Sequence, residues 1–397
     1  MKKCVSDLSD AQLRGKRVLV RVDFNVPMDK KTKTVKDDMR IVSSLPTIRY
    51  LIDKGSKVIL VSHLGRPEGV TEGLRMDPIA KRLEELLGEK VIKVDDCIGP
   101  EVESAIARME GGEVIMLENV RFHKEEEAND ANFAKQLAAL ADVYVDDAFG
   151  TAHRAHASTE GVARILPGVC GFLIAKELEI MGKALDDPKR PFVAIIGGAK
   201  VSTKISVIGN LARKVDTLII GGGMIFTFLK ARGAEVGRSL VEEKFITQAG
   251  EIWNGLTAMP HLKLITPVDA VITNELVAGA PSRIVPIDRI PSDMMGVDIG
   301  PETVERFKAA IASAGTIIWN GPLGVFEQEP FDWGTNEIAR ALAASGAVTI
   351  IGGGDSALAV EKAGVADKMT HISTGGGASL EYLEGRKLPG IAVLQDR

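Results

Sequence analysis

Short apolar runs rich in β-branched residues recur along the whole chain, and this pattern limits the possible folds more than any other feature. The runs are RVLVRVD, KVILVS, EVIMLE and DVYVDD in the first half, and FVAIIGG, TLIIGGG, LKLITPVD, TIIWNG and AVTIIGGG in the second. Between them lie segments with helical periodicity, such as residues 77–90 and 132–141. Apolar strands separated by helices are typical of parallel sheets covered on both faces. The sequence therefore predicts an α/β fold.

A change of pattern near residue 170 predicts a boundary between two domains. The stretch CGFLIAKELEIMGKALDDPKRPF reads as one helix that ends at DDP and is followed by a new strand. A chain of 397 residues is long enough for two such domains. We predict an N-terminal domain over residues 1–170, a hinge helix over residues 171–187 and a C-terminal domain over residues 188–377.

Charge and cysteine usage exclude several classes of protein. The net charge of −5 argues against a general role on nucleic acid or membrane surfaces, which favours basic chains. Cys4, Cys97 and Cys170 are far apart and form no CxxC pair, which excludes a disulfide framework and a cysteine-based zinc site. The chain starts without an apolar signal segment and has no run that approaches about 18 apolar residues. We therefore predict a cytoplasmic protein with no nucleic-acid or membrane partner.

Polar and cationic segments follow the strands of the first half. They are DFN (23–25), SHLGRP (62–67), ENVRFH (118–123) and DDAFGTAHR (146–154). Ligands of open parallel sheets bind at this edge, and clustered positive charge calls for an anion. The planar guanidinium of arginine fits carboxylate and phosphate oxygens, so a small ligand with both groups is predicted. The candidate residues are Arg40, His63, Arg66, Arg121, His153 and Arg154.

The segment AHRAH (152–156) leaves three interpretations open. A metal would need more ligands than His153 and His156, and Arg154 between them would oppose a cation. A catalytic histidine is possible because the pKa of imidazole lies near neutrality. For His156, a hydrogen bond to a neighbouring loop is the simpler interpretation. For Arg154, anion binding is favoured. Arg21, inside a strand, could likewise bind an anion or pair with Asp23.

Glycine clusters follow the strands of the second half. They are GGAKVSTK (197–204), GGGM (221–224), GGGDS (352–356) and STGGGAS (373–379), and NGPLGVFE (320–327) is a further loop at this edge. Glycine lets the backbone approach a ligand closely, and a following helix offers free N–H groups to phosphate. These clusters predict a nucleotide site. Lys200 and Lys204 are candidates for phosphate contacts, Glu327 for the ribose and Asp355 for Mg²⁺.

An acidic phosphorylated ligand in one domain and a nucleotide in the other predict phosphoryl transfer. The chain has no P-loop sequence and no protein-kinase signature. Two alternatives remain. One is a nicotinamide-dependent dehydrogenase that uses GGGDSA (352–357) as its dinucleotide turn, although the acidic residue expected about 20 positions later is missing. The other is a protein that binds phosphorylated ligands without transfer.

Eight motifs, in this order and along nearly the whole chain, resemble those of the phosphoglycerate kinase family. They are RVDFNVP, SHLGRP, LENVRF, DDAFGTAHRAHAS, GGAKVSTKI, WNGPLGVFE, GGGDS and STGGGASLE. The resemblance implies two Rossmann-like domains and reversible transfer between 1,3-bisphosphoglycerate with ADP and 3-phosphoglycerate with ATP in glycolysis. It also implies a Mg²⁺ requirement and a monomer.

The resemblance places the 3-phosphoglycerate site in the N-terminal domain. It implies that Asp23 and Asn25 contact the glycerate part, and that Arg40 lies at the transferring phosphoryl group, opposite Lys204 and the backbone of residues 375–377. Its implied catalytic residues are Arg40, Lys204, Gly375 and Gly376. Its implied substrate-binding residues are Asp23, Phe24, Asn25, Arg40, His63, Leu64, Gly65, Arg66, Arg121, His153 and Arg154.

The resemblance places the nucleotide site in the C-terminal domain, with Asp355 at the metal-nucleotide and the adenine against residues 221–223 and 320–323. Its implied nucleotide-binding residues are Gly198, Ala199, Lys200, Lys204, Gly221, Gly222, Asn320, Pro322, Glu327, Gly353, Gly354, Asp355 and Ser356. The tail, residues 378–397, is expected to pack back on the N-terminal domain. The loop 29–36 departs from the family pattern, so its conformation stays open.

Overall fold

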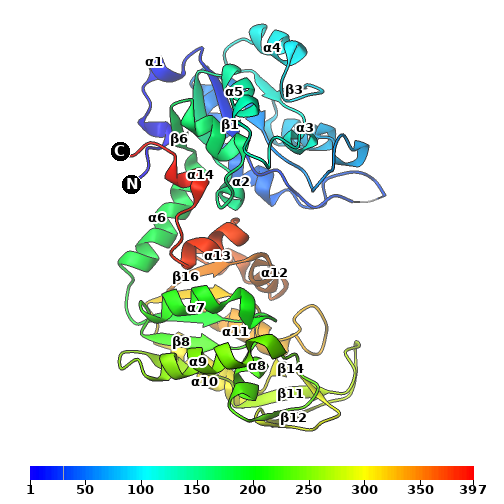
Figure 1. The fold of residues 1–397 in the computed structure, drawn as a ribbon, viewed down its shortest axis with the longest axis vertical. Coiled ribbons are helices and arrows are strands. Elements are labelled where there is room, and N and C mark those ends of the chain that lie inside the picture. Colours follow the sequence, from blue (N-terminus) through cyan, green and yellow to red (C-terminus); the bar gives the residue numbers. More distant parts are fainter. Residues whose placement is uncertain (30) are drawn as a thin grey trace. The chain divides into compact units, whose positions relative to one another are not determined.

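The structure, a computed structural model, describes residues 1–29 and 31–397. It divides into unit 1, residues 1–179 and 387–397, and unit 2, residues 180–386. The division falls within helix α6 (Phe172–Asp186), in the segment predicted to connect the domains. Each unit has its own parallel sheet, which confirms the predicted α/β class with two Rossmann-like sheets (Figure 1).

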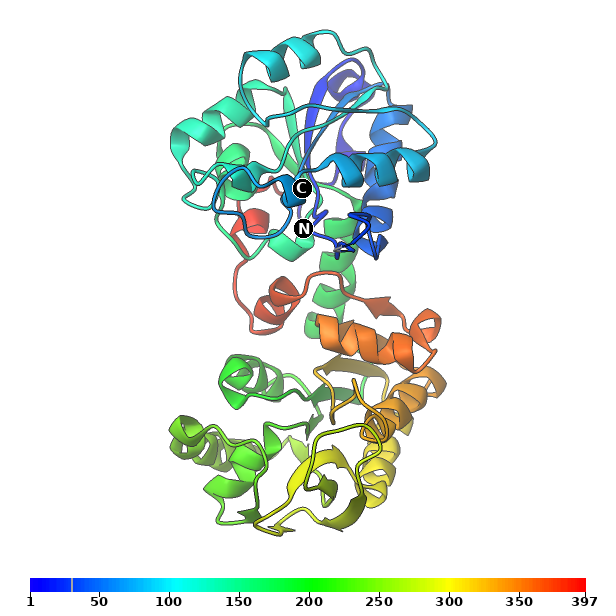
Figure 2. The ribbon, with the colours of Figure 1, turned by 90° about the vertical axis from the view of Figure 1, so that its right-hand side faces the viewer.

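A six-stranded parallel sheet forms the centre of unit 1, in the order β3-β4-β2-β1-β5-β6. Its strands are β1 (Arg17–Arg21), β2 (Lys57–Val61), β3 (Val91–Lys93), β4 (Val114–Met116), β5 (Val143–Asp146) and β6 (Gly168–Cys170). Figure 2 shows helices on both faces of this sheet. The helices are α1 (Asp10–Leu13), α2 (Met39–Asp53), α3 (Asp77–Leu87), α4 (Pro100–Ala107) and α5 (Ala131–Ala139). Because both faces are covered, the strands are apolar along their length rather than alternating.

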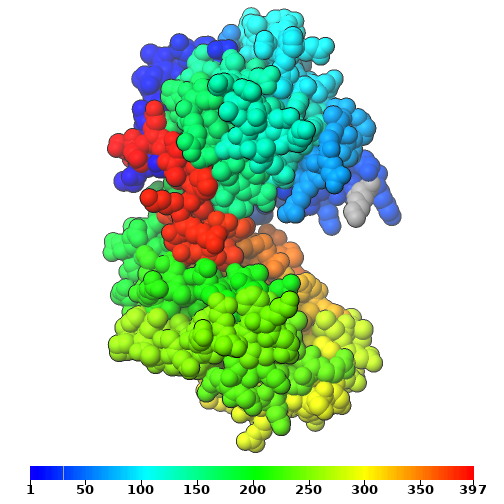
Figure 3. Space-filling view, in the orientation of Figure 1, coloured from blue at the N-terminus to red at the C-terminus, as the bar shows by residue number. Residues whose placement is uncertain are grey.

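The end of the chain returns to unit 1, where the last residues lie on its surface (Figure 3, red). Gln395 N donates to Gly168 O at 2.9 Å, and α14 (Pro389–Ala392) lies in this segment. The tail was expected to start at residue 378. Instead, α13 (Gly377–Leu383) packs on α7 (Ile205–Ala212) within unit 2, where Asn210 Nδ2 donates to Leu383 O at 2.5 Å.

Unit 2 contains a second six-stranded parallel sheet, in the order β10-β8-β7-β15-β16-β17. Its strands are β7 (Phe192–Ile196), β8 (Thr217–Ile220), β10 (Lys263–Ile265), β15 (Thr316–Asn320), β16 (Val348–Gly352) and β17 (His371–Ile372). Figure 2 shows green helices on one face and yellow to orange helices on the other. Besides α7 and α13, the helices are α8 (Ile225–Ala231), α9 (Ile246–Thr257), α10 (Pro301–Ala312), α11 (Trp333–Ala344) and α12 (Gly354–Lys362).

A small antiparallel sheet in unit 2 was not predicted. Its order is β12-β11-β14, and a separate strand pair joins β13 to β9. The strands are β9 (Glu235–Val236), β11 (Asp269–Thr273), β12 (Ser282–Pro286), β13 (Arg289–Ile290) and β14 (Met295–Ile299). The prediction of one strand over LKLITPVD is wrong, because this stretch forms β10 and the start of β11 in different sheets. Pro267 lies between them and has no N–H to continue a ladder.

The loop 29–36, whose conformation the sequence left open, contains a backbone hydrogen bond in which Asp29 N donates to Thr34 O at 2.9 Å. Lys30 lies outside the described residues. Within the described residues, no helix combines the length and the apolar character that a membrane span requires.

Candidate functional site

The loops that follow β1, β2 and β4 interlock at one edge of the unit 1 sheet. These strands are neighbours in the order β4-β2-β1. Gly65 N donates to Asn25 Oδ1 at 2.9 Å, and Arg121 Nη1 donates to Gly65 O at 2.7 Å. The structure therefore brings together three of the segments that the sequence singled out. Phe24 and Leu64 are buried, so these two residues offer the edge their backbone rather than their side chains.

Arg40 joins this edge from the first turn of α2. Its Nη1 lies 2.9 Å from Asp23 Oδ2 and donates to Asn25 O at 3.1 Å. About a third of the Arg40 side chain is exposed (34%), whereas the Asp23 side chain is nearly buried (8%). A buried carboxylate thus orients an arginine whose outer part remains accessible.

His63 is neutral rather than cationic, which corrects its place among the positively charged candidates. The side chain is buried, and burial lowers the pKa of His63 well below its usual value, with Arg21 and Arg121 acting in the same direction. Its Nδ1 lies 3.1 Å from Arg21 Nη2. A neutral imidazole can donate or accept a hydrogen bond, so His63 adds polarity to the edge without adding charge.

Arg21, Ser158 and Glu126 form a buried network that positions this edge. Arg21 Nε donates to Ser158 Oγ at 2.9 Å, and Ser158 Oγ donates to Glu126 Oε1 at 2.6 Å. Arg21 therefore does not pair with Asp23, as one interpretation of the sequence had it. Sequence reasoning missed Glu126 and Ser158, because Glu126 lies in the run KEEE, which resembles a solvated charged loop. Nothing in that run distinguishes the one glutamate that is fully buried.

The segment AHRAH follows η4 (Phe149–Thr151), after β5. Arg154 is half-buried, and its Nε donates to His153 Nε2 at 3.2 Å. His156 Nδ1 lies 3.8 Å from Glu126 Oε1, and burial lowers the pKa of His156 to about 4. A guanidinium that faces an imidazole nitrogen argues against a metal there. Anion binding remains the better interpretation for Arg154. Arg66, in the loop 62–67, is exposed.

The unit 1 edge is cationic overall. Burial raises the pKa of Asp146 to about 8, so this carboxyl group is mostly protonated at pH 7 and neutralises little of the arginine charge. Arg121 Nε lies 3.1 Å from Glu127 Oε1, and the exposed position of Glu127 lets solvent screen this ion pair. A bound anion would compensate the excess positive charge.

Unit 2 contains a cavity of about 480 Å³ at the ends of its parallel strands. This volume lies in the range of small-ligand sites. Apolar side chains such as Phe226, Leu240 and Val325 line one part, and Glu327 and Asp355 contribute carboxylates. Six residues predicted for the nucleotide line this cavity: Gly198, Ala199, Gly222, Pro322, Glu327 and Asp355.

Asn320 and Ser356 hold the glycine loops of this site together. Asn320 Nδ2 donates to Gly352 O at 2.8 Å, and Gly321 N donates to Ser356 Oγ at 2.6 Å. Lys204 Nζ donates to Asn320 Oδ1. Burial lowers the pKa of Lys204 to about 8, while Asp355 and Glu384 raise it. Because a bound phosphate would stabilise its charged form, Lys204 is well placed for a phosphate contact.

The other predicted residues of unit 2 lie around these loops. Lys200 is exposed at the start of η7 (Val201–Thr203). Gly221 is buried, and a Cβ there would lie 2.6 Å from Leu323 Cδ2. Gly353 and Gly354 begin α12, and Gly375 and Gly376 precede α13. The structure does not place Gly353, Gly354, Gly375 or Gly376 in the wall of the cavity.

Asp298 is a site residue that the sequence did not reveal. It lines the cavity, is buried, and accepts hydrogen bonds from Gly334 N at 2.6 Å and Ile299 N at 2.9 Å. Burial raises the pKa of Asp298 to about 8. Sequence reasoning missed it because β14 was not predicted and no neighbouring motif marks it.

The raised pKa of Asp298 predicts a specific pH dependence of stability. Between its usual value of 3.8 and about 8, the folded state holds a proton that the unfolded state releases, so the free energy of unfolding falls as pH rises through this window. The slope for one such group is at most about 1.4 kcal/mol per pH unit. Asp298→Asn, which cannot ionise, is expected to show a shallower decline in urea unfolding at a series of pH values. Equal slopes in both proteins would contradict the assigned environment. Asp146 acts in the same direction, so some decline remains in the variant.

Comparisons with known proteins give one consistent result. A model of the family described as phosphoglycerate kinase matches residues 8–386. The chain is 60% identical over 397 residues to a phosphoglycerate kinase of Dictyoglomus turgidum, with 100% of both chains covered. It is 60% identical over 391 residues to one of Moorella thermoacetica, covering 98% of this chain and 99% of the relative.

Solved structures agree with the sequence matches. The structure of phosphoglycerate kinase from Coxiella burnetii superposes with a TM-score of 0.89 at 42% identity, covering 99% of this chain and 98% of that one. The enzyme from Pyrococcus horikoshii gives a TM-score of 0.85 at 34% identity, with the same coverage of 99% and 98%. The fold, the motifs and the identity along the whole chain lead to one assignment. The chain belongs to the phosphoglycerate kinase family.

Proposed function

We propose that this protein catalyses the reversible, Mg²⁺-dependent transfer of a phosphoryl group between 1,3-bisphosphoglycerate with ADP and 3-phosphoglycerate with ATP. This is the glycolytic reaction of its family, to which it is similar along the whole chain. The observation that carries the proposal is the pair of unlike half-sites. Unit 1 gathers arginines around a neutral His63, and unit 2 holds a glycine-walled cavity.

The acidic substrate is assigned to unit 1. Arg66, Arg121 and Arg154 would bind the carboxylate and phosphate of 3-phosphoglycerate, because guanidinium groups form paired hydrogen bonds with such oxygens. Asp23 and Asn25 would contact the glycerate part. Since Asn25 already accepts from Gly65 N, its position is fixed before substrate binds.

The nucleotide is assigned to unit 2. The apolar part of the cavity would take the adenine, Glu327 the ribose, and Lys200 and Lys204 the phosphates. Lys200 is exposed, and Lys204 donates to the uncharged Asn320 Oδ1, so the positive charge of both lysines remains available to phosphate oxygens. The backbone of residues 375–377 would face the transferring phosphoryl group with Lys204.

Asp355 is the residue that would hold Mg²⁺ together with the nucleotide. Mg²⁺ takes oxygen ligands and is usually bound by one or two carboxylates together with substrate phosphates. Asp355 meets this requirement, because it is exposed, lies in the first turn of α12 and lines the cavity. When bound, the ion supplies positive charge to the phosphate oxygens.

Catalysis by the residues of this chain is mainly positioning and charge stabilisation. The acceptor is a carboxylate, which is ionised at neutral pH, so no side chain has to remove a proton from it. Arg40 from unit 1 and Lys204 from unit 2 would stabilise the charge on the equatorial oxygens as the phosphoryl group moves.

Removal of Mg²⁺ and substitution of Asp355 test this proposal together. We expect turnover from 3-phosphoglycerate and ATP, followed by a coupled dehydrogenase, to be lost with a chelator and restored by excess Mg²⁺. Asp355→Ala is expected to need a higher Mg²⁺ concentration for half-maximal rate. Asp367→Ala, a change in the 3-10 turn after α12, serves as the control. Turnover that does not respond to the chelator would contradict the assignment of Mg²⁺.

We also propose that the units close on each other, and that the protein does so as a monomer. The two half-sites belong to different units, and an acyl phosphate hydrolyses readily, so water has to be excluded while the group moves. Small-angle scattering is expected to show a smaller radius of gyration with both substrates than with either alone, at the mass of one chain. An unchanged radius would contradict closure, and twice the mass would contradict the monomer.

A further inference from the structure

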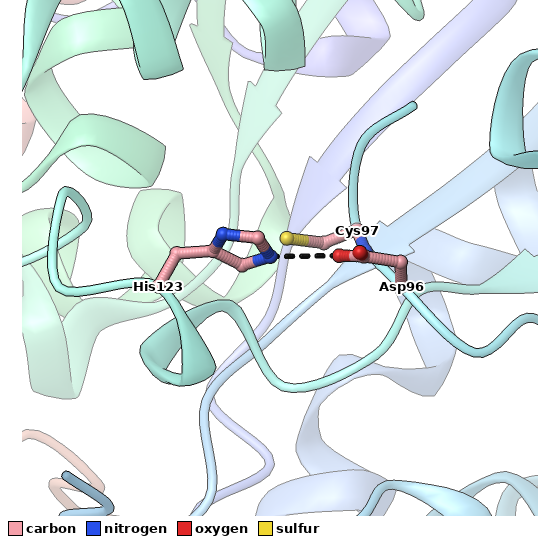
Figure 4. A group of neighbouring side chains, drawn as sticks. All are labelled: Asp96, Cys97 and His123. Atoms are coloured by element: carbon pink, nitrogen blue, oxygen red, sulfur yellow. Dashed lines mark hydrogen bonds and ion pairs between the residues drawn. The ribbon is translucent and has the colours of Figure 1, made fainter. Parts of the chain in front are cut away.

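Asp96, Cys97 and His123 meet in unit 1, and none of the three is among the residues assigned to substrate. Asp96 and Cys97 lie between β3 and α4, and His123 directly follows η3 (Val120–Phe122) after β4. Figure 4 shows the three side chains converging. His123 Nε2 lies 2.7 Å from Asp96 Oδ1. One ligand atom of each residue lies within 4.8 Å of the other two. Among the described residues, no other group of three or more histidine, cysteine, aspartate or glutamate side chains brings its ligand atoms this close together.

We propose that Asp96 Oδ1, Cys97 Sγ and His123 Nε2 bind one divalent ion of the zinc class. Thiolate and imidazole select Zn²⁺ and related transition metals, whereas Mg²⁺ takes oxygen ligands alone. Zinc bonds of about 2.0–2.3 Å in a tetrahedron separate the ligand atoms by roughly 3.3–3.7 Å. The three ligand atoms lie within 4.8 Å of one another, so metal binding requires the Asp96–His123 pair at 2.7 Å to open and any wider spacing to contract towards these values. The Cys97 thiol gives its proton to solvent as the metal–sulfur bond forms, and water fills the fourth position.

The surroundings hold two of these ligands in place without a metal. The Cys97 side chain is fully buried, and its backbone N donates to Asp96 Oδ1 at 2.7 Å. The His123 ring packs on Phe133 of α5, with ring centroids 5.2 Å apart. The third ligand, Asp96, is half exposed (52%) and His123 less so (28%), which leaves an approach from solvent. Fixed ligands with an open approach are what a metal site requires.

The proposed site would connect two loops of the substrate edge. His123 O accepts from Glu126 N at 3.2 Å, and Glu126 anchors Ser158 and thereby Arg21. Arg121 lies two positions before His123 in the same segment. A metal here would therefore fix the segment that carries Arg121 to the loop after β3. The absence of a CxxC pair in the sequence argued against a cysteine-based zinc site. The proposed site does not follow that pattern, because its ligands come from two separate loops and include a single thiol.

Cobalt binding tests the proposal directly. Protein freed of metal with a chelator is titrated with Co²⁺, and thiolate-to-cobalt charge transfer is read in the near ultraviolet. We expect saturation at one ion per chain, displacement by Zn²⁺ and no displacement by Mg²⁺. His123→Gln is expected to weaken binding by more than about 100-fold, the upper limit for loss of an outer-shell partner. His261→Gln, which removes an exposed histidine of unit 2, should bind as the wild type does.

Two results would overturn the proposal. The first is the absence of a saturable charge-transfer band in the wild type. The second is equal binding by the wild type and His123→Gln. Either would mean that Asp96 and His123 form an ordinary surface ion pair over a packed thiol. Because Cys97 is buried, Cys97→Ala is used only if its circular dichroism matches that of the wild type, and it should then lose the band. Because the Asp96 side chain is half exposed, Asp96→Asn is expected to keep the fold and to weaken binding.

Discussion

Arg40→Ala is expected to lower kcat by about 10²–10³-fold, the effect of removing one preorganised donor to transition-state charge. The KM for 3-phosphoglycerate should change far less, because the main role assigned to Arg40 is to stabilise charge on the transferring phosphoryl group in the transition state. In the structure only its Nη1 has a protein partner among the described residues, at Asp23 and Asn25 O. Its other guanidinium nitrogens remain available to a phosphoryl oxygen.

Arg49→Ala is the matched control for this variant. Arg49 lies on the same helix α2, is exposed, and donates to Leu86 O at 2.6 Å. Steady-state kinetics of both variants, with ATP and 3-phosphoglycerate varied in turn, should show a kcat effect for Arg40 alone. A rise in KM with unchanged kcat would assign Arg40 to ground-state binding instead.

Gly222→Ala is expected to lower the free energy of unfolding of unit 2 by about 3 kcal/mol or more, which is near the upper end for single substitutions. Gly222 has φ of +68°, a conformation that costs other residues about 1–2 kcal/mol. A Cβ there would also lie 2.5 Å from Gly198 N and 2.7 Å from Pro322 O. These are backbone atoms of the cavity wall, so the loops have to move apart and ATP binding should be lost as well.

Gly209→Ala is the same type of change, but it is expected to raise the free energy of unfolding rather than lower it. Gly209 lies inside α7, and a Cβ there meets no atom within 4 Å. Alanine in a helix interior is favoured over glycine by roughly 0.5–1 kcal/mol, so this variant should be slightly more stable. Denaturant unfolding of both variants measures the difference. If Gly222→Ala and Gly209→Ala destabilised the protein equally, the close approach of Gly222 to the backbone of Gly198 and Pro322 would be contradicted.

The sequence was most informative about the strands and the edge where they end. Buried parallel strands leave continuous apolar runs such as TIIWNG, and the segments directly after them carry Asp23, His63, Arg121 and Asp355. These features are local, since a strand and the loop after it are adjacent in the chain. The family match also decides against the dehydrogenase alternative for GGGDSA.

The features that sequence reasoning missed depend on contacts between distant segments. The buried Glu126 is set apart from Glu125 and Glu127 by its hydrogen bonds to Ser158, which lies on a segment far along the chain. The neutral state of His63 results from burial and from arginines of other loops. Asp298 lies on β14, whose antiparallel partner β11 was not predicted beyond its first residue, Asp269. No local pattern encodes such environments.

Direct transfer between the two half-sites is the central claim, and a single-turnover experiment tests it most directly. Enzyme in excess is mixed with ATP labelled in its γ-phosphoryl group, with and without 3-phosphoglycerate. We expect the label to pass to the carboxyl group of 3-phosphoglycerate, with none on the protein and none released when the acceptor is absent. Label that accumulates on the protein, or that appears as free phosphate without acyl phosphate, would contradict direct transfer.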